Sequence, residues 1–451
     1  MYSFSKRLKL SAIIFMILGA IGIAYGFYAA PSTTNDVQEM MMHQENEHGD
    51  AHTTAIVEPV VNHSTENTKE EVTESSESDH LTHALHQMQN RPYTAIFIAM
   101  FFFFMIALGT LVFYAIQYAS QAGWSIVLLR VMEGITAYLL PGSLFILAFL
   151  IISAVNGHHY YVWMNPDFYN PQSEHYDEIL VGKSWWLNTP FWMIRAFIFL
   201  LGWNIYRYFA VKFSLAQDAS KDLTYYKKSM KISIYFLLFF VVSESMMSWD
   251  WIMSLTPHWQ STLFGWYVFA SLFVSAITVI AIVTIYLRSK GLLPKVNDSH
   301  LHDLAKFMFG FSIFWTYLWF SQFMLIWYAN MPEETTYFIP RLLGNYQILF
   351  IGMLLPNFIF PILVLMNSDY KRIPWFIIAT GILLLVGHYI DIFVMITPPT
   401  VGNSWSIGIP EISSILFFLG VFIYVVFTAL TKAPLLVKGN PFLKESEHFH
   451  Y

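Results

Sequence analysis

The sequence predicts an all-α integral membrane protein with about ten transmembrane helices. Of its 451 residues, 56% are hydrophobic and 12% are charged, and the mean hydropathy is +0.49. A soluble domain carries about 25% charged residues, so this chain has roughly half the usual fraction. The apolar residues also collect in blocks of about 20, the length that crosses the ~30 Å hydrocarbon core of a bilayer.

Residues 1–30 are predicted to form an N-terminal transmembrane anchor. Their apolar stretch, 9–29, begins among three basic residues, which is also typical of a signal peptide. The stretch is long for a signal peptide, and Tyr-Ala-Ala at 28–30 is a poor cleavage site, so we favour a retained anchor. Gly22 and Gly26 form a GxxxG step, which lets another helix approach closely.

Residues 31–92 are predicted to be an acidic, flexible linker on the periplasmic side. They hold 12 of the 30 acidic side chains, against only Lys69 and Arg91, and they lack hydrophobic periodicity. A segment of this composition buries too little apolar surface to become ordered. Its acidity would repel nucleic acid, so we expect no nucleic-acid partner.

Nine further spans follow the linker. Thr189 and Pro190 suit a helix start, because a hydroxyl caps the first turn and proline is tolerated there. Pro356 and Pro361 should kink the eighth span, since each removes an intrahelical hydrogen bond. The spans are predicted at 93–116, 126–155, 189–211, 232–255, 263–287, 304–329, 343–366, 373–396 and 411–431.

The distribution of Lys and Arg predicts that both termini lie in the cytoplasm. With the N-terminus inside, the cytoplasmic segments hold 19 of the 24 basic residues and the other side holds five. Cytoplasmic loops of membrane proteins carry an excess of Lys and Arg, and the inverted topology would reverse this ratio.

Seven ionisable side chains inside the spans are the candidate functional residues. An ionisable group in a membrane span is costly to bury, so it is usually paired or placed on a hydrated path. Carboxylates and imidazole can accept and release protons, while Arg stabilises their charged forms. The predicted proton pathway comprises Arg130 and Glu133 in its inner part, Glu244 in the middle, and Arg195, Asp250, His388 and Asp391 in its outer part.

Two of these pairs also have a structural interpretation. Arg130 and Glu133 lie three residues apart on one helical face, so they fit a buried ion pair that locks helices together. His388 and Asp391 have the same spacing and fit a hydrogen-bonded pair that fixes helix packing. Residues three apart on a helix are neighbours, so spacing alone leaves both interpretations open.

The isolated carboxyl groups carry similar alternatives. Glu244 has no obvious partner in its own helix, and burial would favour its neutral form, which suits either proton exchange or plain packing. Asp250 lies between two tryptophans near the outer interface and fits a cap or an anchor. Glu411, at the start of the last span, is interpreted as a helix-dipole residue without a further role.

The residue types also restrict the cofactors. The chain has no cysteine, which excludes an intrinsic iron–sulfur cluster, a C-x-x-C-H haem attachment and any disulfide. Of the 16 histidines, only His388 lies clearly within the hydrocarbon region, so no facing pair is available for an intramembrane haem. The linker residues His80, His83 and His86 are interpreted as part of a solvated tract. We therefore expect no redox cofactor, no metal and no catalytic residue in this chain.

Three runs of the sequence carry a resemblance to a known family. They are SWDWIMSLTPHW at 248–259, continuing to FGWY at 264–267; the aromatic stretch 314–328, which leads into ANMPEE at 329–334; and LPNF at 355–358. With these runs the chain resembles the F subunits (ActF) of alternative complex III, which are polysulfide-reductase-like (NrfD-like) membrane subunits. The likeness covers nearly the whole chain apart from the linker.

The resemblance implies an arrangement of the spans and a location. In this family two four-helix bundles, here 93–255 and 256–397, are flanked by one helix at each end. The last helix would then lie within 398–431 and be followed by a cytoplasmic tail, 432–451. The implied location is the bacterial inner (cytoplasmic) membrane.

The resemblance also implies partners and a reaction. Alternative complex III is a quinol:cytochrome c oxidoreductase of the respiratory chain, which oxidises membrane quinol and passes electrons to a periplasmic cytochrome c or directly to a terminal oxidase. Its haem c groups and iron–sulfur clusters reside in separate multihaem cytochrome c and iron–sulfur subunits, beside an NrfD-like C subunit. These subunits, a terminal oxidase and membrane lipids are the expected partners.

Three roles remain for this chain. The ionisable residues favour proton transfer across the membrane coupled to quinol oxidation. A structural scaffold or a quinone-binding subunit of the same complex is the alternative, since an aromatic content of 18% suits either packing or a quinone or quinol pocket. An independent secondary transporter ranks lower, because only the eighth span is obviously broken by proline.

Overall fold

The chain folds as an all-α membrane protein, as the sequence predicts. A computed structural model describes residues 2–38, 69–155 and 160–450, and over 69–80 only the course of the backbone. In these ranges the chain contains no strand, and nine helical segments are long and apolar enough to cross a membrane. α7 (Thr189–Ala219) is also long enough, but it carries Arg195 and Arg207 and is not one of the nine.

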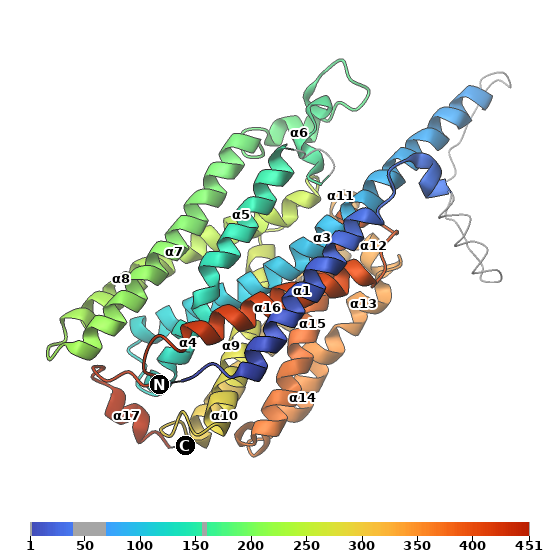
Figure 1. Cartoon of the computed structure of the whole chain (residues 1–451). Helices are drawn as coiled ribbons and strands as arrows, with labels where there is room; N and C mark the ends of the chain where they lie inside the picture. Colours follow the sequence, from blue (N-terminus) through green and yellow to red (C-terminus); the bar gives the residue numbers. More distant parts are fainter. Residues whose placement is uncertain (1, 39–68, 156–159, 451) are drawn as a thin grey trace.

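Two helices at the centre of the molecule are almost completely buried. They are α9 (Phe264–Ser289) and the apolar C-terminal part of α3 (Lys69–Ala119), which pack against each other. Their apolar side chains cover all faces, as is expected of helices enclosed by other helices. The outer helices shield them from lipid (Figure 1).

The remaining long helices pack around this central pair in two groups. In the first group, α3 contacts α5 (Leu139–Val155) and α8 (Thr224–Trp251), while α7 contacts both α5 and α8. In the second group, α9 contacts α10 (Asp298–Ala329) and α15 (Pro374–Val401), and α14 (Phe360–Leu365) contacts both α10 and α15. The contact between α3 and α9 joins the two groups.

The two flanking helices, α1 (Lys6–Tyr28) and α16 (Ile409–Ala429), lie side by side (Figure 1). Gly19, Gly22 and Gly26 are buried on the face of α1 that meets α16. The prediction that the GxxxG step allows a close helix contact is therefore confirmed. Both chain ends lie at the same end of the molecule (Figure 1).

The eighth span is broken where the prolines predict a kink. α13 (Gln347–Gly352) is followed by a π-helical turn (Leu355–Ile359) and then by α14. Pro356 lies in the π turn and Pro361 in the first turn of α14. Each proline lacks the N–H that would continue a regular α-helical ladder.

The predicted linker over 31–92 differs from the structure in its last part. α3 begins at Lys69, which is 24 residues before the predicted start at 93, and residues 39–68 lie outside the described residues. The stretch 69–91 contains neither Gly nor Pro, so nothing in it interrupts the helix. The C-terminal end of the stretch 69–91 is held by Arg91, whose Nε lies 2.7 Å from Glu411 Oε1. Glu411, for which no role was expected, thus ties α16 to α3.

Local features complete the helix boundaries. α7 starts at Thr189 as predicted, but its cap is the Asn188 side chain, which accepts a hydrogen bond from the Phe191 amide. The third predicted span, 126–155, forms one helical segment, in which 3₁₀ turns precede and follow α4. The shorter helices are α4 (Leu129–Ile135), α6 (Glu178–Lys183), α11 (Pro332–Thr335), α12 (Ile339–Leu342) and α17 (Leu443–Glu447).

Candidate functional site

The inner end of the predicted pathway is a buried network of four side chains. On α4, Arg130 is 3% exposed and donates from Nη1 to Glu133 Oε2. Arg130 Nη2 also lies 2.5 Å from Asp218 Oδ2 at the end of α7, and the Tyr114 hydroxyl of α3 donates to Glu133 Oε1 over 3.1 Å. The expected pair is therefore part of a network that joins three helices.

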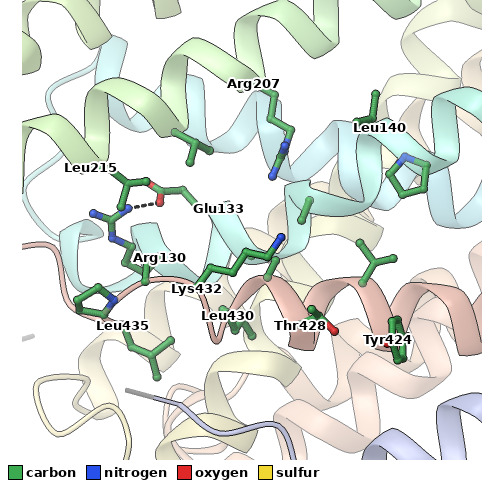
Figure 2. A pocket seen from close by; sticks show the side chains of 18 residues that line it. Arg130, Glu133, Leu140, Arg207, Leu215, Tyr424, Thr428, Leu430, Lys432 and Leu435 are labelled. Atoms are coloured by element: carbon green, nitrogen blue, oxygen red, sulfur yellow. Dashed lines mark hydrogen bonds and ion pairs between the residues drawn. The ribbon is translucent and has the colours of Figure 1, made fainter.

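A cavity of about 450 Å³ adjoins this network between α4, α7 and the end of α16 (Figure 2). Arg130 and Glu133 lie on one side of it, while Arg207 and Lys432 point into it from other segments. Most of the remaining lining is aliphatic, including Leu215. The cavity thus combines basic groups with an apolar wall.

The middle of the predicted pathway is Glu244 on α8. Its side chain is buried, and its Oε1 has no hydrogen-bond partner among the described residues. The neighbouring Ser243 hydroxyl instead accepts a hydrogen bond from Trp203 Nε1 of α7 at 2.9 Å. An unpaired buried carboxyl group is costly, so this position is the least satisfied of the seven.

The outer group in the first helix bundle is an ion pair between α7 and α8. Asp250 is completely buried, and Arg195 holds it with two bonds, Nε to Oδ2 at 2.6 Å and Nη2 to Oδ1 at 2.9 Å. Trp186 Nε1 donates to Oδ1 at 2.9 Å, and the Arg195 guanidinium lies 4.2 Å from the centre of the Trp186 ring. Asp250 is therefore held against α7 by a cation from that helix.

The outer group in the second helix bundle surrounds Asp391 on α15. The carboxylate is completely buried and accepts hydrogen bonds from the Tyr267 hydroxyl of α9 and, at 2.9 Å, from Trp315 Nε1 of α10. His388 Nδ1 bonds instead to the Ser271 hydroxyl at 3.0 Å and lies 3.7 Å from Asp391 Oδ2. His388 and Asp391 are thus in contact as an i, i+3 pair, while neighbouring helices supply the closer hydrogen-bond partners.

Unpaired polar atoms lie beside this second group. His388 Nε2 and both polar side-chain atoms of Asn357 are buried without hydrogen-bond partners among the described residues. Asn357 belongs to the π turn, and Gly387 lets that turn approach α15, since a Cβ there would lie 2.8 Å from Pro356. Buried polar atoms of this kind are usually satisfied by ordered water.

The structure brings the predicted residues together in separate clusters. It joins Arg130 with Glu133 and Arg195 with Asp250, and it leaves Glu244 alone. Among the described residues, no pathway residue of the first bundle forms a hydrogen bond or ion pair with a pathway residue of the second. Sequence reasoning missed the partners that other segments supply, which are Tyr114, Trp186, Asp218, Tyr267, Ser271 and Trp315. It also missed the unpaired Asn357 beside His388.

The fold and these buried groups define a polytopic helical membrane protein with ionisable side chains in its interior. Within the described part of the chain, no three His, Asp or Glu side chains gather as ligands for a metal ion. No model of a known protein family matches the chain, and a search of curated proteins finds no match either.

Proposed function

We propose that this chain is a membrane subunit of a respiratory quinol:cytochrome c oxidoreductase of the alternative complex III type. In this proposal it binds no redox cofactor of its own and supports proton transfer across the inner membrane, coupled to quinol oxidation. The haem c and iron–sulfur centres belong to partner subunits. The assignment to this complex rests on the sequence runs that resemble its F subunits.

The observation that carries the proton role is the environment of Glu244. It lies between the Arg130–Glu133 network and the Arg195–Asp250 pair, and it is the member of the predicted pathway whose carboxyl lacks a partner. Asp250 is six residues further along α8, about 9 Å by the rise of an α-helix. A carboxyl group in this position can take up and release a proton without breaking an ion pair.

The ion pairs on either side of Glu244 would act by placing positively charged guanidinium groups at both ends of the route. Arg195 donates two hydrogen bonds to the Asp250 carboxyl, and Arg130 donates to Glu133 and Asp218. Side chains alone do not bridge the distances between the clusters, so the route requires water. The unpaired atoms of His388 and Asn357 offer such water hydrogen-bonding sites in the second bundle.

A scaffold role is the first alternative, and the Arg195–Asp250 pair favours it. Both carboxylate oxygens of Asp250 accept hydrogen bonds from Arg195 or Trp186, as expected of a static contact, although Arg195 Nη1 has no partner among the described residues. A quinone site is the second alternative. A cavity of about 300 Å³ beside the pair is lined by Trp186, Trp249 and Trp259, and its volume is at the lower limit for small-molecule pockets. An independent transporter finds support only in the broken eighth span.

Replacing Glu244 by Gln tests the proton role. The change is nearly isosteric and removes the titrating group, so the complex should assemble while proton translocation falls. Asp391→Asn serves as a second variant in the other bundle. Glu178→Gln, which makes the same chemical change at an exposed position, is the control.

The measurement is quinol-driven proton release and charge movement in proteoliposomes, normalised to intact complex. Unchanged translocation in both Glu244→Gln and Asp391→Asn would leave the route without support. Loss of assembled complex together with activity would favour the scaffold alternative.

A further inference from the structure

The cavity between α4, α7 and the end of α16 contains two basic groups that form no ion pair with the described residues. Arg207 and Lys432 point into the same space (Figure 2), and the described residues supply no ion pair to either. Arg207 Nε is buried without a hydrogen-bond partner. A buried cationic group of this kind requires an anion or water beside it.

The acidic side chains near the cavity are already engaged. Glu133, the acidic residue of the lining, bonds to Arg130 and accepts the Tyr114 hydroxyl. Arg130 is shared with Asp218 as well, so that network contains one cation and two carboxylates. Glu133 attracts Arg207 across the cavity, but neither Arg207 nor Lys432 forms an ion pair within the network, so the donors of both can still bind an external anion.

The rest of the lining shows what kind of molecule carries that anion. The wall is mostly aliphatic, and two of its residues, Leu140 and Leu215, are 52% and 41% exposed. Leu140 belongs to a membrane-crossing helix, so its exposed surface faces the hydrocarbon of the bilayer, while Leu215 lies near the end of α7, at the edge of the membrane. The cavity is thus basic at its centre and continuous with an apolar outer surface. A free inorganic anion would gain nothing from that surface, whereas an acyl chain would.

We propose that this cavity binds the head group of an anionic phospholipid. Arg207 and Lys432 hold the phosphate through charge-assisted hydrogen bonds, and an acyl chain lies along Leu140 and Leu215. Basic pockets between transmembrane helices on the cytoplasmic side suit such head groups. The charge count places this cavity on that side, beside the C-terminal tail. The site adjoins the Arg130–Glu133 part of the proposed proton route, but lipid binding there does not require proton transfer.

Binding is tested on the full-length chain, purified in detergent and stripped of lipid. Native mass spectrometry then follows the addition of phosphatidylglycerol, of cardiolipin and of zwitterionic phosphatidylethanolamine. We expect one anionic lipid to bind at least about tenfold more tightly than phosphatidylethanolamine, a preference that corresponds to about 1.4 kcal/mol. The variant Arg207→Gln/Lys432→Gln should lose this preference.

The matched control is Arg7→Gln/Lys438→Gln, which removes two positive charges from exposed positions outside the cavity. It should bind lipid as the unmodified chain does. Equal binding of anionic and zwitterionic lipid by the unmodified chain would overturn the proposal, whether or not the variants fold. Displacement of the lipid by millimolar inorganic phosphate would also overturn it, because the site would then recognise the free anion.

Discussion

Three of the buried carboxyl groups of the spans, Asp250, Asp391 and Glu244, differ in what surrounds them. Asp250 is held by a guanidinium, Asp391 by a hydroxyl and an indole N–H, and Glu244 Oε1 has no partner among the described residues. Each environment stabilises a charged carboxylate to a different extent, because a cation contributes more than a neutral donor. The same residue type can therefore be structural at one position and titrate at another.

Breaking the pair between Arg195 and Asp250 should destabilise the protein strongly. Asp250→Asn leaves a buried guanidinium without its anion, and removing one partner of a buried pair costs about 3–5 kcal/mol. Replacing both residues, as in Arg195→Met/Asp250→Leu, should cost less than either single change. Thermal unfolding of the purified chain, followed by tryptophan fluorescence, measures the three variants. A double variant as unstable as the sum of the singles would contradict a direct interaction.

Asp177 should make the loop between the third and fourth spans sensitive to acid. Burial raises the pKa of its carboxyl, but hydrogen bonds from the Leu180 amide and from His258 outweigh this, so the pKa lies below its ordinary value. The carboxylate thus stabilises the loop above the unfolded-state pKa of about 3.9, and this contribution is lost as the pH falls through the lower folded value. Hydrogen-exchange protection of the Ile179 and Leu180 amides should fall accordingly.

Asp177→Asn separates this effect from general acid unfolding. The amide side chain does not titrate over this range, so protection at Leu180 should be weaker at neutral pH and should no longer change with acid. Asp177→Ala, which removes the cap of α6, should cost about 1 kcal/mol locally. An acid response that persists in Asp177→Asn would assign the effect to another group.

At the scale of the element, small residues decide where α1 can pack. A Cβ at Gly19 would lie 2.7 Å from Phe417 Cα of α16, and one at Gly26 would lie 2.9 Å from Pro410 Cγ. Contacts this close force a backbone to move, since neither neighbour is a flexible side-chain end. The glycines thus determine which helix α1 meets and how closely.

Gly19→Val should therefore separate α1 from α16. Cysteine pairs placed across this contact, one on each helix, should crosslink in the unmodified chain and crosslink less in the variant. Gly310→Ala in α10 is the control, because a Cβ there meets nothing within 4 Å. That change should leave crosslinking unaltered and stabilise the helix by up to about 1 kcal/mol. Equal crosslinking in Gly19→Val would show that α16 yields to the added methyl groups.

The broken eighth span shows how one element can serve another. The π turn places Asn357 against Gly387, directly before His388 in α15. A regular helix without the two prolines would present different side chains to α15, because a π turn shifts the helical register by one residue. The break therefore positions an unpaired amide beside the polar group of the second bundle.

For the whole molecule, the charge distribution predicts a single topology. A reporter fused after Tyr451 or placed in the 212–231 loop should report the cytoplasm, and one within 31–92 should report the periplasm. The positive-inside rule provides the reason, since 19 of 24 basic residues lie on the side assigned to the cytoplasm. The two chain ends lie at the same end of the molecule, as this topology requires (Figure 1). A cytoplasmic reporter within 31–92 would contradict the whole assignment.

The sequence by itself determined the class of fold and the position of nearly every span. Apolar runs of about 20 residues, the prolines at 356 and 361, and the GxxxG step act locally, so their consequences can be read without a structure. The sequence did not predict the start of α3, because the polar first turns of this helix have no hydrophobic periodicity, although they contain no helix breaker. The candidate residues were likewise evident as ionisable groups inside apolar segments.

Only the tertiary structure decided what those residues contact. Asp250 and Arg195 are 55 positions apart in the chain, and Asp391 is 124 positions from Tyr267. His388 and Asp391, although adjacent on one helical face, take closer partners from α9 and α10. The hydrophobic pattern of a helix specifies that it is buried, but the partner of a buried polar group depends on how the helices are rotated and paired, and that arrangement is set by packing throughout the molecule.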